Sequence, residues 1–514
     1  MTENQSSFIY EFVDRNSTPD IVCEYPRDLT EDCPLIIDNG SYQYRAGWAI
    51  NDEPSIIFKN VIAKNRGNRK DRDWDILVGN DIPDLEAVRW MIRTAFDFNI
   101  VVNFGIQESV FDHSFRNLGI NTEGGIHHPV VLTEPVANPA YCRKQMSELL
   151  FEAYNIPKLM YGIDSLFSYQ YNKESLNLGD CALLISSGFQ STHILPIIDG
   201  NLDINNVKRI NLGGYNNGAY LQRLLQLKYP KQSNIFTLTR MDQFLRDKGE
   251  VPLDYITEMK KWSDKKFISK NTIMMQVPEK SNPMSGQITN PPCERTISLG
   301  KKLRRLEYRY YDLECILELE DENPDAMSKA MSDAGYAEVE DINKKMHKLQ
   351  TKIDKLHEEM TFLSQNPLPP TEIPIRVERH QALEILFQPS LVGYDQAGIG
   401  EVMETIFNSY PEDTQNQMAK NVLITGGNTQ YHGFRHRIEA ELTKCRPFGS
   451  ECGVRVAENP TLDAWRGAKK WAMSPMDQKD MWMTRQDYDE HGFEYLKEHK
   501  ASNKYFNVNS PVQE

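Results

Sequence analysis

The sequence has few cysteines and no long apolar run. Its 514 residues include 8 cysteines, none in a CxxC pair, and no Cys/His set has the spacing of a zinc site. Scattered thiols of this kind are typical of free cysteines in a reducing compartment. The polar N-terminus, residues 1–20, lacks the apolar core of a secretory signal, and no apolar stretch nears the roughly 20 residues of a membrane span. We therefore expect a soluble protein of the cytoplasm or nucleus.

An excess of positive charge is missing as well. The formal net charge is -15, which argues against a protein that coats DNA non-specifically, because phosphate binding requires basic charge. A local basic patch is still compatible with this balance. Apolar residues make up 40% and charged residues 25%, an ordinary globular composition. The length suits several domains or one large two-lobed fold.

Two similar strand–turn–strand segments divide the sequence into related halves. An apolar run at 35–37 enters an Asn39-Gly40 turn, and a second run follows at 44–50, which predicts a β-hairpin. The pattern returns at 181–188, with a second run at 194–198. We therefore predict two related α/β lobes.

Other periodic segments fill in these lobes. Apolar runs predict strands at 55–58, 130–132 and 422–425, the last ending in a turn of small residues. Helical periodicity predicts helices over 85–96, 107–118 and 143–154, the last with Met146, Leu149, Leu150 and Ala153 on one face.

Residues 278–375 differ in character from the α/β sequence around them. A linker rich in Pro, Ser and Asn at 281–292 precedes two charged segments whose apolar residues recur at alternating spacings of four and three, a heptad pattern. These residues are Leu299, Leu303, Leu306, Tyr310, Leu313 and Leu317, then Ile342, Met346, Leu349, Ile353, Leu356, Met360 and Leu363. We predict an antiparallel helical hairpin, joined by 321–341 and ended by prolines at 367–370. The alternative is a pair of amphipathic helices lying on the lobe beneath.

These patterns divide the chain into six segments. We expect an N-terminal extension at 1–33, a first lobe at 34–177, a second lobe in two parts at 178–277 and 376–474, the charged insertion at 278–375, and a C-terminal segment at 475–514 that returns to the first lobe.

Five motifs, in a fixed order, resemble signatures of actin and actin-related proteins over nearly all of residues 34–492. They are Asp38-Asn39-Gly40-Ser41 with Arg45-Ala46-Gly47, Leu132-Thr133-Glu134-Pro135, Leu386-Phe387-Gln388-Pro389-Ser390, Thr425-Gly426-Gly427-Asn428-Thr429, and Trp482 with Gln486, Tyr488, Asp489, Glu490 and Gly492. The resemblance implies an actin-like two-lobed α/β fold, built from duplicated ribonuclease-H-like domains, with an inserted helical hairpin. Segments 96–100, 237–241 and 254–256 resemble the nuclear members found in chromatin remodellers of the Ino-eighty class.

The resemblance implies a nucleotide site between two turns, and the first turn keeps much of the family's pattern. Gly40 and Ser41 match residues that donate to phosphate, and Asp38 matches the residue that holds metal-bound water. Arg45 stands where the family has a phosphate-contacting lysine. Tyr42, however, replaces a glycine at which the backbone would approach the phosphates closely.

The second turn departs further from the family. Where the family reads Asp-Ser-Gly-Asp-Gly, this chain reads Ser186-Ser187-Gly188-Phe189-Gln190, so that both carboxylates are missing. Asp164 replaces the water-positioning glutamine, and its charge is unfavourable beside a phosphate. The remaining candidate nucleotide contacts are Gly188, Gly214, Gly426, Gly427 and Asn428, although these glycines are as readily explained by tight turns.

From these replacements we expect no catalytic residue, no metal ligands, and nucleotide bound weakly or not at all. ATP or ADP held without turnover stays an open alternative.

Two basic clusters are candidate contacts for DNA phosphates or an acidic histone surface. The first is Lys64, Arg66, Arg69, Lys70 and Arg72, for which a solvated loop offset by neighbouring aspartates is an equal alternative. The second is Lys301, Lys302, Arg304 and Arg305, at the start of the predicted hairpin. The stretch 61–77 does not resemble the family's polymer-contacting loop, so filaments are not expected.

The resemblance implies a non-catalytic subunit of a nuclear ATP-dependent chromatin remodelling complex, with roles in transcription and DNA repair. It further implies contact with the remodeller's motor subunit, a small companion subunit and the nucleosome, and no membrane. The alternatives are an actin-type ATPase whose nucleotide state gates assembly, and a cytoskeletal actin-related protein.

Overall fold

The computed structural model describes most of the chain and divides it into two compact units. The described residues are 8–12, 17–26, 28–64, 76–85, 89, 91–276, 294–322, 324–336, 338–365, 372–474, 481–493, 495 and 497–504. The body unit comprises those within 14–272 and 375–514, and the insertion unit those within 1–13 and 273–374. None of the described helices is both long and apolar enough to cross a bilayer.

The first sheet of the body unit is built on the hairpin predicted at the Asn39-Gly40 turn. Its strand order is β20-β11-β10-β2-β3-β4. The bounds are β2 (Leu35–Asn39), β3 (Gln43–Trp48), β4 (Ile56–Lys59), β10 (Val130–Glu134), β11 (Lys158–Ile163) and β20 (Met483–Thr484). Strands β2 and β3 run antiparallel with Asp38 opposite Arg45, while β10 and β11 run parallel to β2.

The second sheet repeats this arrangement with different residues. Its order is β14-β13-β12-β18-β19, with β15 also pairing β13. The bounds are β12 (Ala182–Ser187), β13 (Thr192–Ile198), β14 (Asn201–Leu202), β15 (Lys208–Ile210), β18 (Val422–Thr425) and β19 (Val454–Val456). An antiparallel hairpin followed by two parallel strands gives the order β3-β2-β10-β11 in the first sheet and β13-β12-β18-β19 in the second. The prediction of two related lobes is confirmed, and we call them the first and second lobes.

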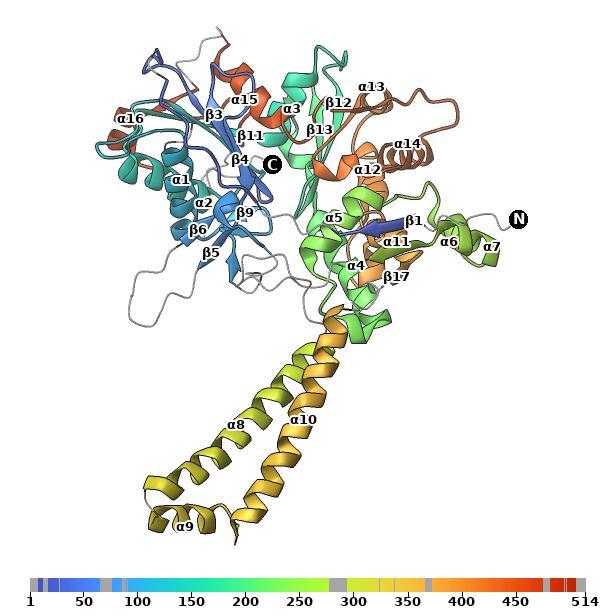
Figure 1. Ribbon diagram of the computed structural model, residues 1–514. Coiled ribbons are helices and arrows are strands. Elements are labelled where there is room, and N and C mark those ends of the chain that lie inside the picture. The colour runs from blue at the N-terminus through green and yellow to red at the C-terminus, as the bar shows by residue number, and fades with distance from the viewer. Residues whose placement is uncertain are drawn as a thin grey trace. The chain divides into compact units, whose positions relative to one another are not determined.

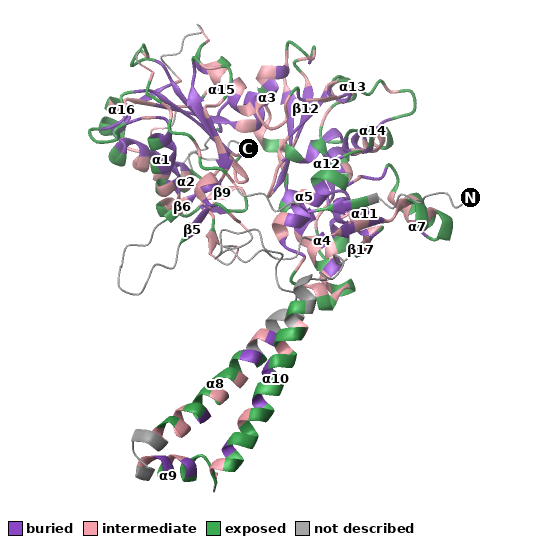
Figure 2. Cartoon of the chain, viewed as in Figure 1, coloured by how far each residue is buried: buried purple, intermediate pink, exposed green. Residues whose placement is uncertain are grey.

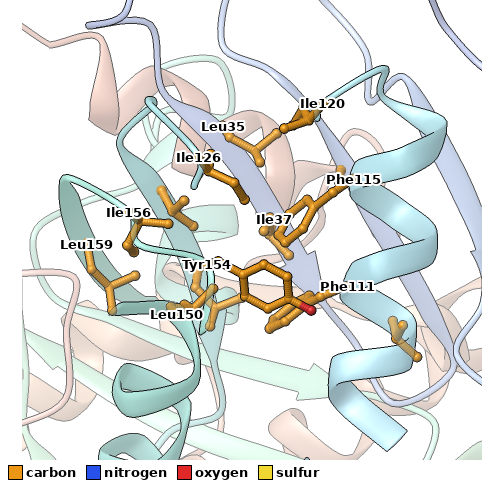
Figure 3. Close-up of a cluster of buried hydrophobic side chains, with 14 of the residues drawn as sticks. Leu35, Ile37, Phe111, Phe115, Ile120, Ile126, Leu150, Tyr154, Ile156 and Leu159 are labelled. Carbon is orange, nitrogen blue, oxygen red and sulfur yellow. The ribbon is translucent and has the colours of Figure 1, made fainter. Parts of the chain in front are cut away.

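Helices surround both sheets, and in the second lobe some of them pack mainly on one another (Figure 1). The first lobe carries α1 (Phe104–Asn117), α2 (Ala140–Glu148), the π-helical turn η2 (Leu149–Ala153) and α16 (Arg485–His491). The second lobe carries α4 (Gly214–Lys228), α5 (Leu238–Lys248), α6 (Tyr255–Lys261), α7 (Lys265–Asn271), α11 (Glu378–Glu384), α12 (Ile399–Phe407), α13 (Glu412–Lys420) and α14 (Phe434–Lys444). In Figure 3, Phe111 and Phe115 of α1 pack with Ile37 of β2 in the first lobe's core.

Two helix predictions need correction. Residues 85–96 do not form a helix where they are described, because β7 (Ile92–Arg93) pairs with β5 (Ile62–Lys64) and β8 (Phe96–Asp97) pairs with β9 (Ile100–Val101). Phe96 is buried although it lies in a short strand and not in a helix. Tertiary contact therefore overrides the helical periodicity of the sequence. The helix predicted over 143–154 exists, but η2 shifts its face, leaving Ala153 exposed while Tyr154 is buried.

The remaining short elements of the body unit complete its edges. They are β6 (Ile76–Val78), which pairs β5, and the 3₁₀ turns η1 (Gly79–Asp81), η3 (Ile204–Asn206), η4 (Pro230–Gln232), η5 (Pro389–Val392) and η6 (Gly427–Gln430).

Two equivalent helices lie between the lobes (Figure 1). Helix α3 (Asp164–Asn172) follows β11, and α15 (Asp463–Ala472) follows β19, so each comes after the last parallel strand of its lobe. The two helices approach closely at Gly467, where an added Cβ would lie 2.0 Å from the carbonyl oxygen of Phe167. The buried Trp465 of α15 donates to the carbonyl of Ile36 in β2 at 3.1 Å. This helix pair therefore sets the distance between the two lobes.

The insertion unit contains the predicted helical hairpin. Helices α8 (Glu294–Glu322) and α10 (Val339–Gln365) lie side by side, and the sheet β1-β16-β17 comprises β1 (Phe8–Glu11), β16 (Ile273–Gln276) and β17 (Glu372–Ile375). Heptad residues Leu313, Ile342 and Leu349 form a buried cluster, and both helices carry separate purple segments in Figure 2. The connecting segment, for which no element was predicted, contains α9 (Pro324–Asp333). Met327 and Met331 of α9 join the same cluster.

We predict that Gly467→Ala destabilises the body unit by about 3 kcal/mol, because the new methyl group overlaps the backbone of α3. Denaturant unfolding followed by circular dichroism measures the change. Gly105→Ala in α1 is the matched control, since its Cβ would meet nothing closer than 3.7 Å. Equal unfolding midpoints for the two variants would contradict the close-packing argument.

Candidate functional site

All nine candidate nucleotide contacts line one cleft of about 370 Å³ between the lobes. The β2–β3 turn enters it from the first lobe, and the β12–β13 turn and the segment after β18 enter it from the second. The residues are Asp38, Gly40, Ser41, Arg45, Gly188, Gly214, Gly426, Gly427 and Asn428. Sequence motifs far apart in the chain therefore meet at one place.

The charged groups of the first turn are bonded to each other. Arg45 donates from Nη1 to Asp38 at 2.8 Å and from Nη2 to Gln43 at 2.8 Å. The other oxygen of Asp38 accepts from the Thr133 hydroxyl at 2.9 Å. Arg45 was expected as a phosphate contact and Asp38 as the holder of metal-bound water, yet each neutralises the other.

The second turn is closed by its own backbone and by Asn428. The amide of Gly188 donates to Ser191 at 2.9 Å, and the Asn428 side chain donates to the Gly188 carbonyl at 2.8 Å and the Ser187 hydroxyl at 3.0 Å. The first of these bonds occupies the Gly188 amide, a donor that is then not free for a phosphate. Asn428 is therefore a positioning residue for the turn.

One of the candidate glycines is required by the backbone, and a second lies close to a side chain. Gly426 has φ +91°, and its added Cβ would lie 2.3 Å from the carbonyl oxygen of Ser187. A Cβ on Gly214 would meet the Asn428 side chain at 2.8 Å. Around Gly427, in contrast, nothing lies within 4 Å of such an atom, so this glycine faces open space in the cleft.

Tyr42 crosses the cleft from the first lobe to the second. Its hydroxyl donates to Asp242 of α5 at 3.1 Å, and its ring centroid lies 4.7 Å from that of Phe189. Arg246 also donates to Asp242, at 2.9 Å. Sequence reasoning missed Asp242 and Arg246. The available signal was that two facing turns had each gained an aromatic residue, at 42 and 189.

Asp164 and His193 are among the titratable groups of the cleft whose pKa values are shifted. Burial, with the nearby Asp38 charge, raises the pKa of Asp164 to about 6. Burial lowers the pKa of His193 to about 3, so its imidazole is neutral at physiological pH. Among the described residues, His193 Nε2, Arg45 Nε and Asn99 Oδ1 are buried without a protein hydrogen-bond partner. Polar atoms of this kind indicate an interior with room for water.

This arrangement does not fit a magnesium-bound triphosphate. Such a ligand requires free cations or amides for the phosphates and a carboxylate for the metal water. Here Arg45, Asp38 and Gly188 already have partners, and the ring of Tyr42 lies between the two turns. Within the described ranges, no group of three or more His, Cys, Asp or Glu side chains is placed to hold a metal ion.

The basic candidates lie in two separate places. Lys64 is exposed at the end of β5, while Arg66, Arg69, Lys70 and Arg72 lie outside the described residues. Lys302, Arg304 and Arg305 are exposed on α8, and the backbone of Lys301 is in the same helix. A groove between α8 and α10 is lined by Lys302, Arg305, Arg309, Lys352, Lys355 and Glu359, around Leu306, Tyr308 and Leu356. We call these lining residues the hairpin groove.

Residues 30–501 match the family model described as Actin, which covers both lobes and the insertion. The chain belongs to the actin family. It is 38% identical to Actin-related protein 5 of Homo sapiens, over 98% of this chain and 95% of the relative. It is also 38% identical to Actin-related protein 5 of Gallus gallus, over 93% and 91%, and 26% identical to that of Drosophila melanogaster, over 92% and 98%. The actin fold expected from the five motifs is confirmed.

We predict that Asp164→Asn raises the melting temperature by about 2–4 °C at pH 7 and leaves it unchanged near pH 4. The pKa of Asp164 is higher in the folded protein than in the unfolded chain. The folded protein therefore loses stability as the pH rises from the ordinary pKa of an aspartate toward about 6, and asparagine, which does not ionise, removes that loss. The amide oxygen keeps the bond that Asp164 accepts from the Ser165 amide. Calorimetric scans at several pH values measure the effect.

Asp180→Asn is the control of opposite sign for this experiment. The hydrogen bond from Lys173 lowers the pKa of Asp180, so its replacement loses stability at pH 7. A gain for Asp164→Asn that does not change between pH 4 and pH 7 would contradict the assignment.

Proposed function

We propose that this protein is a non-catalytic actin-family subunit of a nuclear ATP-dependent chromatin remodelling complex, where it contributes nucleosome contact and complex assembly. The observation that carries the first part is that Arg45 and Arg246, two cations of the cleft, are paired with carboxylates of the protein. The similarity to proteins named Actin-related protein 5 supports the second part, through what the resemblance to nuclear actin-related proteins implies.

Three features of the cleft oppose ATP hydrolysis. Hydrolysis requires a positioned water and a cation that stabilises the developing charge. The side chain at the water-positioning place is Asp164, which adds negative charge, and the cation Arg45 is held by Asp38. The second turn supplies Ser186 and Phe189 in place of the metal-side carboxylates. The cleft then serves to join the lobes and not to turn over a substrate.

The hairpin groove supports the nucleosome contact. Five of its side chains are cations and one, Glu359, is a carboxylate, so the groove is basic although the whole chain is acidic. Such a surface attracts DNA phosphates or an acidic histone surface. Arg305 and Arg309 lie on α8, while Lys352 and Lys355 lie on α10. Because the two helices pack side by side, their positive side chains come together in one groove.

The same proposal includes the partners and the compartment. We infer contact with the remodeller's motor subunit and with a small companion subunit, a nuclear location, roles in transcription and DNA repair, and no filament formation. A cytoskeletal role is the competing function, and a purely cytoplasmic distribution in cells would favour it.

We predict that the purified protein releases phosphate from magnesium-ATP no faster than a Gly40→Ala, Ser41→Ala double variant. Both alterations disturb the first turn, where a Cβ on Gly40 would lie 2.8 Å from the carbonyl of Gln43. A sensitive phosphate-release assay measures the rates. Faster release by the unaltered protein would favour the alternative of an actin-type ATPase.

We predict that Lys302→Glu, Arg305→Glu and Arg309→Glu together weaken DNA and nucleosome binding by the full-length chain. Losing about three phosphate contacts reduces the slope of log affinity against log salt concentration by about three. Binding titrations at several salt concentrations measure that slope.

Lys344→Glu, Lys345→Glu and Lys348→Glu provide the matched control, because they reverse the same number of exposed charges on α10 outside the hairpin groove. Equal losses for both triple variants would show that net charge, and not this groove, governs binding.

A further inference from the structure

The cleft is bridged by protein atoms that belong to opposite lobes. Tyr42 lies in the β2–β3 turn of the first lobe, and its partners Phe189 and Asp242 belong to the second. The two rings meet at 49° with centroids 4.7 Å apart, within the range for favourable aromatic pairs. One side chain thus makes a polar and an apolar contact across the gap.

Cations strengthen this contact on both sides of the cleft. The guanidinium of Arg246 lies 5.5 Å from the Tyr42 ring centroid, and the ammonium of Lys59 lies 5.6 Å from it, both within cation–π range. Burial and the Asp242 charge raise the pKa of Tyr42, so its phenol stays protonated and able to donate. Burial opposes the charge on Arg246, but Asp242, Tyr42 and Tyr431 together outweigh this effect and raise the Arg246 pKa.

Further contacts between the lobes lie elsewhere. The guanidinium of Arg209, in β15 of the second lobe, stands 6.0 Å from the ring centroid of Phe98, between β8 and β9 of the first. Near the helix pair, the hydroxyls of Ser168 and Thr425 lie 3.0 Å apart, joining α3 to β18. These contacts link the lobes in addition to the helix pair α3 and α15.

We propose that Tyr42 is a built-in latch that holds the two lobes together at the place where the family holds nucleotide phosphates, so that closure requires no ligand. We define the latch as Tyr42, Phe189, Asp242 and Arg246. The proposal extends the proposed function, because a cleft that does not hydrolyse ATP still needs something to join its two sides.

The latch and a triphosphate compete for the same space and the same charges. A triphosphate between the turns would have to displace the Tyr42 ring from Phe189. It would also have to break the hydrogen bonds from Arg45 to Asp38 and from Arg246 to Asp242 in order to bind the two cations. Its negative charge would then lie beside the two unpaired carboxylates, which repel it. Magnesium-nucleotide therefore opposes the latch and does not reinforce it.

Hydrogen–deuterium exchange on the full chain tests the latch. In Tyr42→Gly, amides of residues 187–191 and of α5 should exchange at least about tenfold faster, as expected when a hydrogen bond to a charged group is lost. These amides lie in the lobe opposite to the substitution, so a purely local change in the first turn would not affect them. Tyr42→Phe and Asp242→Asn keep the aromatic pair and should give smaller increases.

Tyr44→Phe is the matched control, because it removes a hydroxyl two residues away in the core of the first lobe. It should leave exchange in the second lobe unchanged. Adding magnesium-ATP or magnesium-ADP should not slow exchange at 187–191 in the unaltered protein. The proposal fails if Tyr42→Gly and Tyr42→Phe both exchange like the unaltered protein, or if either nucleotide protects that turn in the unaltered protein.

The exchange experiment and the phosphate-release assay can fail independently. Phosphate release with an intact latch would refute the non-catalytic function alone. Absence of release together with nucleotide-dependent protection would refute the latch alone and would favour a nucleotide held without turnover.

Discussion

The close crossing of α3 and α15 is the constraint on which the body unit depends. Each helix follows the last parallel strand of its own lobe, so the duplication of the strand order also produces a duplicated pair of helices. Gly467 lets the backbones approach to a distance that no side chain would permit, and Trp465 ties α15 to β2. Residues of both sheets share one buried cluster around these helices, including Ile36, Leu184 and Leu423. Because a packed core of this kind resists deformation, the turns at the far ends of the hairpins are held facing each other.

That fixed geometry decides what the cleft is able to bind. In a phosphate site the cations are left without protein partners, so that their charge is available to the ligand. In this cleft each cation has a carboxylate of its own: Arg45 pairs with Asp38, and Arg246 with Asp242. Pairing of this kind lets the charges be partly buried and leaves each cation less available to a ligand. The aromatic replacements at 42 and 189 then fill space that backbone and phosphate would otherwise occupy. Charge pairing and ring packing thus act in the same direction.

The sequence was informative wherever the decisive contacts were local or the motif was long. The Asn39-Gly40 turn predicted the hairpin of β2 and β3, and the heptads predicted two helices with Leu313 and Ile342 inside. Prediction failed where burial depends on distant partners. Residues near Ile92 have helical periodicity but pair with β5. The segment that joins the two long helices contains α9, which was not predicted and whose Met327 and Met331 pack into the hairpin's cluster. The bond from Tyr42 to Asp242 joins positions two hundred apart in the chain, and no local pattern encodes such a meeting.

The insertion is stabilised by a buried cluster of its own, separate from the contacts around the cleft. Strands β16 and β17 are hydrogen-bonded neighbours, so a chain that leaves at one and returns at the other closes its own loop. The hairpin buries its apolar residues in a separate cluster that includes α9, and His357 of α10 lies 3.8 Å from a carboxylate oxygen of Glu307 in α8. A segment with its own core is able to present charged side chains on a firm support, because packed helices fix where those side chains begin. The hairpin groove needs that support: its cations come from two helices, and they act on one partner only while α8 and α10 stay in register.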